Sequence, residues 1–104
     1  MGFFSRIFLR QHDEFADALA KEFIEQCPLA SVTGARDRKA VRKFDKAVNH
    51  LYTRARDYRG RVKLNIYTKA RIGNKFMWAL RDAGYDEVLI EELTNGLLLA
   101  LSGP

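Results

Sequence analysis

The stretch "RDRKAVRKFDKAVNHLYTRARDYRGR", residues 36–61, decides the fold because it joins a regular apolar pattern to a dense positive charge. Its apolar residues recur at alternating spacings of three and four, which places them on one side of a helix at about 100° per residue. They are Val41, Phe44, Val48, Leu51, Ala55, Tyr58 and, just beyond the stretch, Val62. A seam of about three heptads predicts a long helix that buries one face against other helices.

The same stretch holds ten Lys and Arg against three Asp, and most of the cations fall opposite the apolar seam. The candidate polyanion-binding residues are Arg38, Lys39, Arg42, Lys43, Lys46, Arg54 and Arg56. Like charges four residues apart face one another, at a cost of a few tenths of a kcal/mol for each pair. A bound polyanion, nucleic acid first, would offset this cost through phosphate contacts and counterion release. Asn49 and Thr53 share this side and are candidates to donate to a phosphate or a base edge.

The charge of the whole chain is segregated. Residues 36–81 hold fifteen Lys and Arg against three acidic residues, whereas residues 1–35 and 82–104 together hold three against ten. This pattern leaves an alternative to polyanion binding. If the carboxylates of residues 13–25 and 86–92 point at residues 38–46, the basic side is neutralised within the fold or across a dimer.

Length and composition predict one globular domain over residues 1–104. A chain of this length can form one compact core and not two, and its balance of 47% apolar and 30% charged residues is typical of folded proteins. Cys27 is the single cysteine, so the chain has no internal disulfide. With no secretory or membrane-spanning segment in the sequence, we expect a cytoplasmic protein.

Three further helices are expected around the basic one. Over residues 11–27, Phe15, Leu19 and Phe23 recur every four residues, and Pro28 ends that helix. A bend at Gly60 leads to a helix that ends near Ala83, although the alternation in "RVKLNIY" leaves a short β-ribbon at residues 61–68 as the alternative.

The last helix begins after Asp86, a good N-cap, with Gly84 closing the helix before it. We expect Val88, Leu93 and Leu97 to point inward. Together these elements predict an all-α protein, a small four-helix bundle or orthogonal helical array, with the α+β fold as the alternative.

No arrangement of residues in the sequence indicates catalysis. His12 and His50 lie on different predicted elements with no third ligand implied by their spacing, and Glu91 and Glu92 diverge on a helix because they are adjacent. The glycines form no phosphate-binding loop. We therefore expect no enzyme activity, no small-molecule substrate, no metal and no cofactor.

Two apolar features suggest other partners. In the N-terminal segment "MGFFSRIFLR", residues 1–10, one helical face holds the candidates for membrane or partner contact: Phe3, Phe4, Ile7 and Phe8. Docking onto protein is the favoured role for this segment and a membrane surface the weaker one. The segment "NGLLLAL" and the segment around Trp78 hold more apolar residues than one buried helix face requires. This suggests core packing or a homodimer. A regulatory protein-interaction module is therefore the alternative function.

Overall fold

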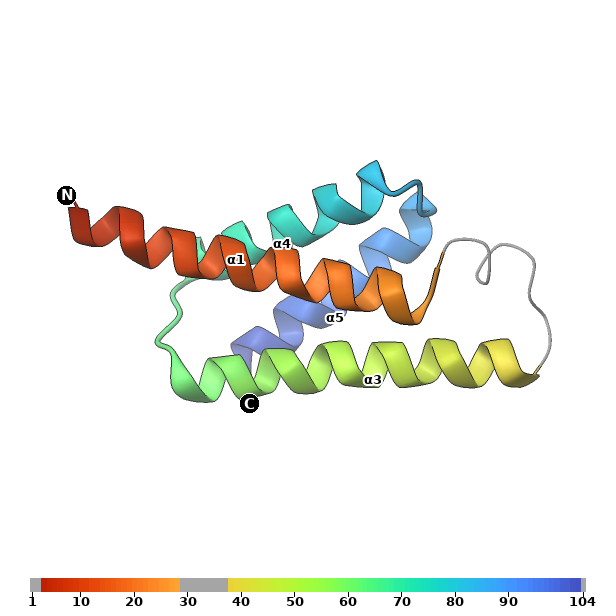
Figure 1. The fold of residues 1–104 in the computed structure, drawn as a ribbon. Helices are drawn as coiled ribbons and strands as arrows, with labels where there is room; N and C mark the ends of the chain where they lie inside the picture. The colour runs from red at the N-terminus through yellow and green to blue at the C-terminus, as the bar shows by residue number, and fades with distance from the viewer. Residues whose placement is uncertain (1–2, 29–37, 104) are drawn as a thin grey trace.

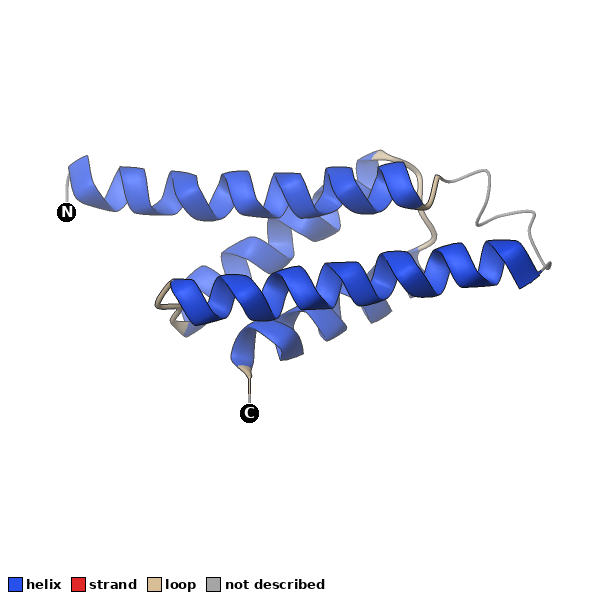
Figure 2. Cartoon of the chain, turned by 60° about the horizontal axis from the view of Figure 1, so that its bottom comes forward, coloured by secondary structure: helices blue, strands red, loops and turns tan. Residues whose placement is uncertain are grey.

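A computed structural model describes residues 3–28 and 38–103, with side chains described from Leu9 onward. Four helices make up this part of the chain: α1 (Phe3–Gln26), α3 (Arg38–Arg61), α4 (Ile66–Asp82) and α5 (Glu87–Ser102). They run alternately in opposite directions and form a small bundle (Figure 1). The predicted all-α class is confirmed, and no strand occurs among the described residues (Figure 2).

The helices pack in a ring around one core. α1 lies against α3 and α4, and α5 closes the ring by packing on the other side of α3 and α4. The core side chains with the largest volume come from all four helices: Leu19, Phe23, Leu51, Ile72, Phe76, Leu80, Ile90, Leu97 and Leu101. The every-fourth-residue pattern of α1 and the seam of α3 are therefore both used for burial, as expected from their periodicity.

Helix α1 begins earlier than expected. The helix predicted over residues 11–27 starts at Phe3, so residues 3–10 form its first turns and not a separate element. Its end agrees with the prediction: Pro28 follows a buried Cys27, whose carbonyl oxygen accepts a hydrogen bond from the hydroxyl of Tyr85. This bond ties the end of α1 to the connection between α4 and α5.

The apolar seam of α3 is buried along only part of its length. Leu51, Ala55 and Tyr58 are buried, but Val41 is 51% exposed. The first buried residue of α3 is Ala47, and the first turns of the helix project beyond the end of α1 in both views (Figures 1 and 2). The expectation of inward packing at Val41 is wrong because no described helix lies opposite that turn.

The region after Gly60 is not a β-ribbon. Gly60 lies inside the last turn of α3, residues 62–65 are irregular, and α4 begins at Ile66. A capping box causes this restart. The side chain of Asn65 accepts a hydrogen bond from the backbone N–H of Thr68 at 2.8 Å, and the Thr68 hydroxyl oxygen accepts one from the backbone N–H of Asn65 at 2.9 Å. The bend predicted at Gly60 is therefore displaced to residues 62–65.

The turn between α4 and α5 follows the prediction. Gly84 has a φ of 92°, which favours glycine, and its N–H donates to the carbonyl of Arg81 while the N–H of Tyr85 donates to the carbonyl of Leu80. Asp86 then caps α5 by accepting from the N–H groups of Val88 and Leu89. Val88 itself is 65% exposed and does not point inward as expected.

Candidate polyanion-binding surface

The predicted cations of α3 gather on a surface that faces solvent. We call the exposed set Arg38, Lys39, Arg42, Lys43, Lys46 and Arg56 the basic face. Five of these six residues lie in the first half of α3, where the helix projects from the bundle (Figure 1). Their position follows from the wheel geometry, because the opposite side of the helix is buried from Ala47 onward.

Several acidic side chains of the flanking helices pair with cations outside the basic face. Asp13 of α1 accepts from Arg71 of α4 at 2.7 Å, and Glu87 of α5 accepts from Arg81 of α4 at 2.6 Å. Glu14 pairs with Arg10 within α1. Within residues 9–28 and 38–103, no ion pair joins a carboxylate to the basic face. The described residues therefore contain no ion pair that neutralises the basic face.

Arg54 differs from the other six candidates. Its guanidinium donates from Nε and Nη2 to the two carboxylate oxygens of Glu22, at 3.1 and 2.9 Å, and lies over the ring of Phe15. The hydrogen bond from Arg54 lowers the pKa of Glu22, with His50 adding to the effect. Arg54 therefore joins α3 to α1, and its charge is compensated by Glu22. The helical wheel places Arg54 at one side of the polar surface of α3, but the sequence alone does not show that α1 covers this side.

The polar residues beside the basic face have mixed roles. Asn49 is exposed, and Thr53 accepts a 3.4 Å hydrogen bond from Arg56. Tyr52 is half-buried against α5, where its hydroxyl lies over Gly96 so closely that a Cβ there would be 2.1 Å from it. Burial raises the pKa of Tyr52, and the charge of Glu92 adds to this. Tyr52 thus packs at the border of the core, while Asn49 is free to face a ligand.

The two histidines lie in different surroundings. His12 is buried, with its Nδ1 at 2.7 Å from the hydroxyl of Tyr58, and His50 lies 3.1 Å from a Glu22 carboxylate oxygen on the surface. No group of three or more His, Cys, Asp or Glu side chains that could hold a metal ion occurs in the part of the chain that the structure describes. Both of these contacts join α1 to α3.

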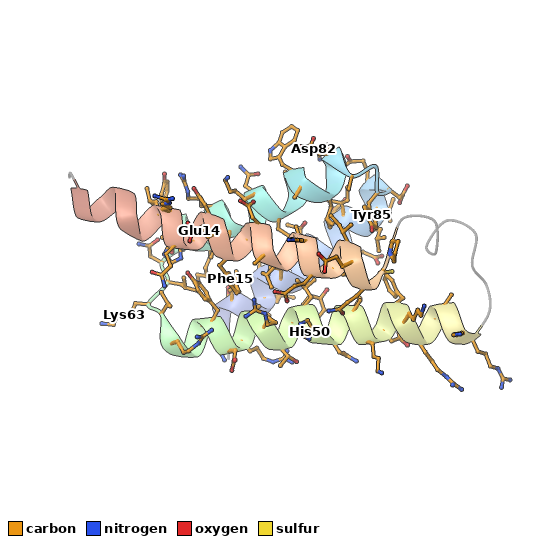
Figure 3. The ribbon with its side chains drawn as sticks, viewed as in Figure 1. Glu14, Phe15, His50, Lys63, Asp82 and Tyr85 are labelled. Carbon is orange, nitrogen blue, oxygen red and sulfur yellow. The ribbon has the colours of Figure 1, made fainter. Side chains whose placement is uncertain are left out.

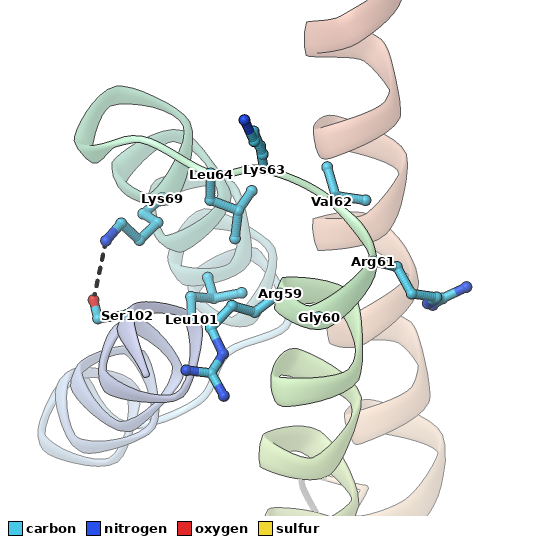
Figure 4. A pocket seen from close by; sticks show the side chains of 9 residues that line it. All are labelled: Arg59, Gly60, Arg61, Val62, Lys63, Leu64, Lys69, Leu101 and Ser102. Atoms are coloured by element: carbon cyan, nitrogen blue, oxygen red, sulfur yellow. Dashed lines mark hydrogen bonds between the residues drawn. The ribbon is translucent and has the colours of Figure 1, made fainter. Parts of the chain in front are cut away.

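The sequence did not indicate one further cationic feature. A pocket of about 350 Å³ opens where α3 leads into α4, beside the end of α5 (Figure 4). Its lining includes Arg59, Arg61, Lys63, Lys69 and Ser102, and no carboxylate of a described residue. Lys69 Nζ lies 3.5 Å from the hydroxyl of Ser102. The residues come from three segments, so only the fold brings them together.

The side chains of the N-terminal candidates Phe3, Phe4, Ile7 and Phe8 lie outside the described residues, although the backbone there is helical. Trp78, expected in the core or an interface, is 52% exposed and its ring lies 4.6 Å from the guanidinium of Arg81. Among the described helices, none is both long enough and apolar enough to cross a bilayer. Comparison with protein-family models, curated proteins and solved structures gave no match.

Proposed function

We propose that this chain is a non-catalytic binding protein whose basic face contacts a polyanion, nucleic acid first. The observation that supports it is the absence of carboxylate partners for the basic face among the described residues, although Asp13, Glu22 and Glu87 are each paired with a cation of another site. The single cysteine is compatible with a reducing compartment, and we place the activity in the cytoplasm.

The ladder of like charges on α3 gives the physical reason. Arg38, Arg42 and Lys46 follow one another at intervals of four, and Lys39 and Lys43 form a second ladder beside them. Each pair of like charges disfavours the free helix by a few tenths of a kcal/mol. Phosphates bound along the helix would reverse the sign of this term, and they would release condensed counterions from the nucleic acid.

The shape of this surface fits an extended ligand. From Arg38 to Arg56 the helix rises about 27 Å at about 1.5 Å per residue, a length along which a duplex presents many phosphates. The projecting first turns of α3 have no described helix packed on their outer side (Figure 2). A helix with an open outer side is narrow enough to approach a major groove. Phosphate contacts by Arg and Lys carry no sequence information, so we propose non-specific binding.

The experiment is a fluorescence-anisotropy titration with labelled random duplex and single-stranded oligonucleotides. The double variant Arg42→Glu/Lys46→Glu should abolish binding at moderate salt and leave the helical circular dichroism unchanged. Arg61→Glu/Lys63→Glu is the matched control, because it changes the net charge equally at the far end of α3. Equal loss of affinity in both variants, or no loss in the first, would reject the basic face as the binding surface.

A second candidate is a protein-interaction module, including a homodimer, that associates through apolar helix faces. Leu99 is 74% exposed beside a groove between α3 and α5 whose lining includes Tyr52, Gly96 and Ala100. Ionic strength separates the two candidates. Polyanion binding weakens steeply between low and physiological salt, whereas apolar association does not. Light scattering across the same salt series reports the mass of any self-associated species.

A further inference from the structure

One end of the bundle combines exposed apolar side chains with cations that pair with no carboxylate of the described residues. The irregular residues 62–65 and the first turn of α4 form this end, and the first turns of α1 project past it (Figure 1). It is the opposite end from the projecting turns of α3 that hold Arg38 and Arg42. This separation makes it a surface distinct from most of the basic face.

The apolar part of this end consists of two consecutive residues. Ile66 is 83% exposed, more than any other large hydrophobic side chain that the structure describes, and Tyr67 beside it is 62% exposed. Both belong to the first turn of α4, next to the capping residue Asn65. Neither residue belongs to the hydrophobic core or packs against it, and the side chain of Tyr67 interacts with that of Arg71.

The charged part consists of four cations close to this pair in the sequence. Arg61 and Lys63 are exposed just before Ile66, and Lys63 extends outward from the end of the bundle (Figure 3). Arg59 and Lys69 line the adjoining pocket, where Lys69 reaches toward Ser102 and the Arg61 side chain points away (Figure 4). None of these four cations forms an ion pair with a carboxylate of the described residues. On α1, Asp13 is paired with Arg71 and Glu14 with Arg10.

We propose that this end of the bundle docks on the surface of an anionic lipid bilayer. Ile66 enters the boundary between headgroups and acyl chains, and Tyr67 lies at headgroup level, where its amphipathic ring is favoured. Arg61 and Lys63 contact lipid phosphates around them, with Arg59 and Lys69 adding to the local positive potential. A bilayer suits this end of the bundle because its acyl chains can accept the apolar side chains while its anionic headgroups attract the cations.

The direction of α1 supports this occupant. Its backbone is helical from Phe3, and its first turns project past the α3–α4 connection in both views (Figures 1 and 2). By sequence this projecting part contains four large apolar residues within six positions, residues 3–8. The sequence of residues 3–8 supplies a second apolar signal in addition to Ile66, Tyr67 and their neighbouring cations, and stable surface binding requires two signals.

The first test is co-sedimentation of the full chain with vesicles of phosphatidylcholine, either alone or with about 30% phosphatidylserine. Binding is expected to the anionic vesicles only. Arg61→Glu/Lys63→Glu should weaken it by about thirtyfold or more, since each cation near such a surface adds about fivefold. Arg42→Glu/Lys46→Glu, with the same change in net charge, should alter it less than threefold. The two variants should have the opposite order of effects on oligonucleotide binding. Failure of the membrane proposal can therefore be distinguished from failure of the proposed function.

The apolar contribution has its own matched pair. Ile66→Ser/Tyr67→Ser should reduce vesicle binding about tenfold or more, whereas Trp78→Ser/Val88→Ser, which removes an exposed aromatic and an exposed aliphatic residue at the other end, should leave it unchanged. Circular dichroism confirms that each variant is folded. Equal effects of the two double variants would overturn the proposal, as would equal binding to neutral and anionic vesicles.

The orientation of the protein on the vesicle can be determined from tryptophan fluorescence, because Trp78 is the single tryptophan. In the natural chain its emission should stay constant when anionic vesicles are added. In a Tyr67→Trp/Trp78→Phe variant the emission should move to shorter wavelength, because the new indole enters a less polar environment. A shift at Trp78 and none at position 67 would contradict docking through this end.

Discussion

The imidazole Nδ1 of His12 lies 2.7 Å from the hydroxyl oxygen of Tyr58, joining α1 to α3 inside the core. The ring of Tyr58 also stacks on Phe15, with centroids 3.7 Å apart. A titratable ring therefore sits in the packed contact between two helices. Its protonation opposes folding, because an added charge there must lose its hydration.

Folding stability should depend on the protonation of His12. Burial lowers the pKa of His12 from its usual 6.5, and the charge of Asp13 opposes this only in part. The unfolded chain takes up the proton at a higher pH than the folded core does. The free energy of unfolding should therefore be maximal above about pH 6.5 and fall as the pH drops below that value. Urea unfolding at about pH 7.5 and about pH 5 measures the difference.

The control for this dependence is His12→Gln, which retains a polar group for Tyr58 and does not titrate. Its stability should be lower overall but nearly constant between the two pH values. The lowered pKa values of Asp13 and Glu22 affect stability in a more acidic range, since those contributions are lost as the pH falls through the folded pKa of each carboxyl. An identical pH dependence in the variant and the natural chain would assign it to other groups.

Two glycines in helices should respond in opposite ways to alanine. A Cβ at Gly96 would lie 2.1 Å from the Tyr52 hydroxyl, whereas one at Gly60 meets nothing within 4 Å. Gly60→Ala should stabilise the fold by up to about 1 kcal/mol through helix propensity. The Gly96→Ala variant should be less stable by about 1 kcal/mol, because the cost of displacing Tyr52 outweighs the gain in helix propensity. Thermal and urea unfolding of both variants tests the close approach of α3 and α5.

Arg54 should matter for stability and little for polyanion binding. Arg54→Gln removes the paired hydrogen bonds to Glu22 and should lower the free energy of unfolding by about 0.5–1 kcal/mol, the range of a partly exposed ion pair. Its affinity for oligonucleotides should stay within about twofold. Arg42→Gln should do the reverse, with unchanged stability and about fivefold weaker binding. If Arg54→Gln weakens binding as much as Arg42→Gln, Arg54 belongs to the binding surface after all.

The sequence predicted features that local chemistry determines. Periodicity located the buried faces of α1 and α3, and Gly84 and Asp86 marked the turn between α4 and α5 through their own backbone and capping preferences. The Asn65–Thr68 capping box is a local signal for the start of α4. The alternation of Val62, Leu64 and Ile66 left the β-ribbon open as an alternative to the expected helix, and this alternative is wrong.

Other features depend on how helices meet. The heptad pattern continues through Val41 whether or not a helix lies opposite, so it could not show where burial begins. The ion pair between Asp13 and Arg71 joins residues 58 positions apart, and only the packing of α1 on α4 creates it. The same holds for the Glu22–Arg54 pair and for the cationic pocket around Arg59, which required the relative placement of three segments.

The salt dependence of oligonucleotide affinity tests the central claim most directly. The slope of log affinity against log salt counts the phosphates neutralised, at about 0.9 for each contact on duplex DNA. In Arg38→Gln/Arg42→Gln/Lys46→Gln the slope should be smaller by about 2.7, while Arg59→Gln/Arg61→Gln/Lys63→Gln should change it by less than about 1. Two results would contradict the account: an affinity of the natural chain that does not change with salt concentration, or an equal slope in the first triple variant.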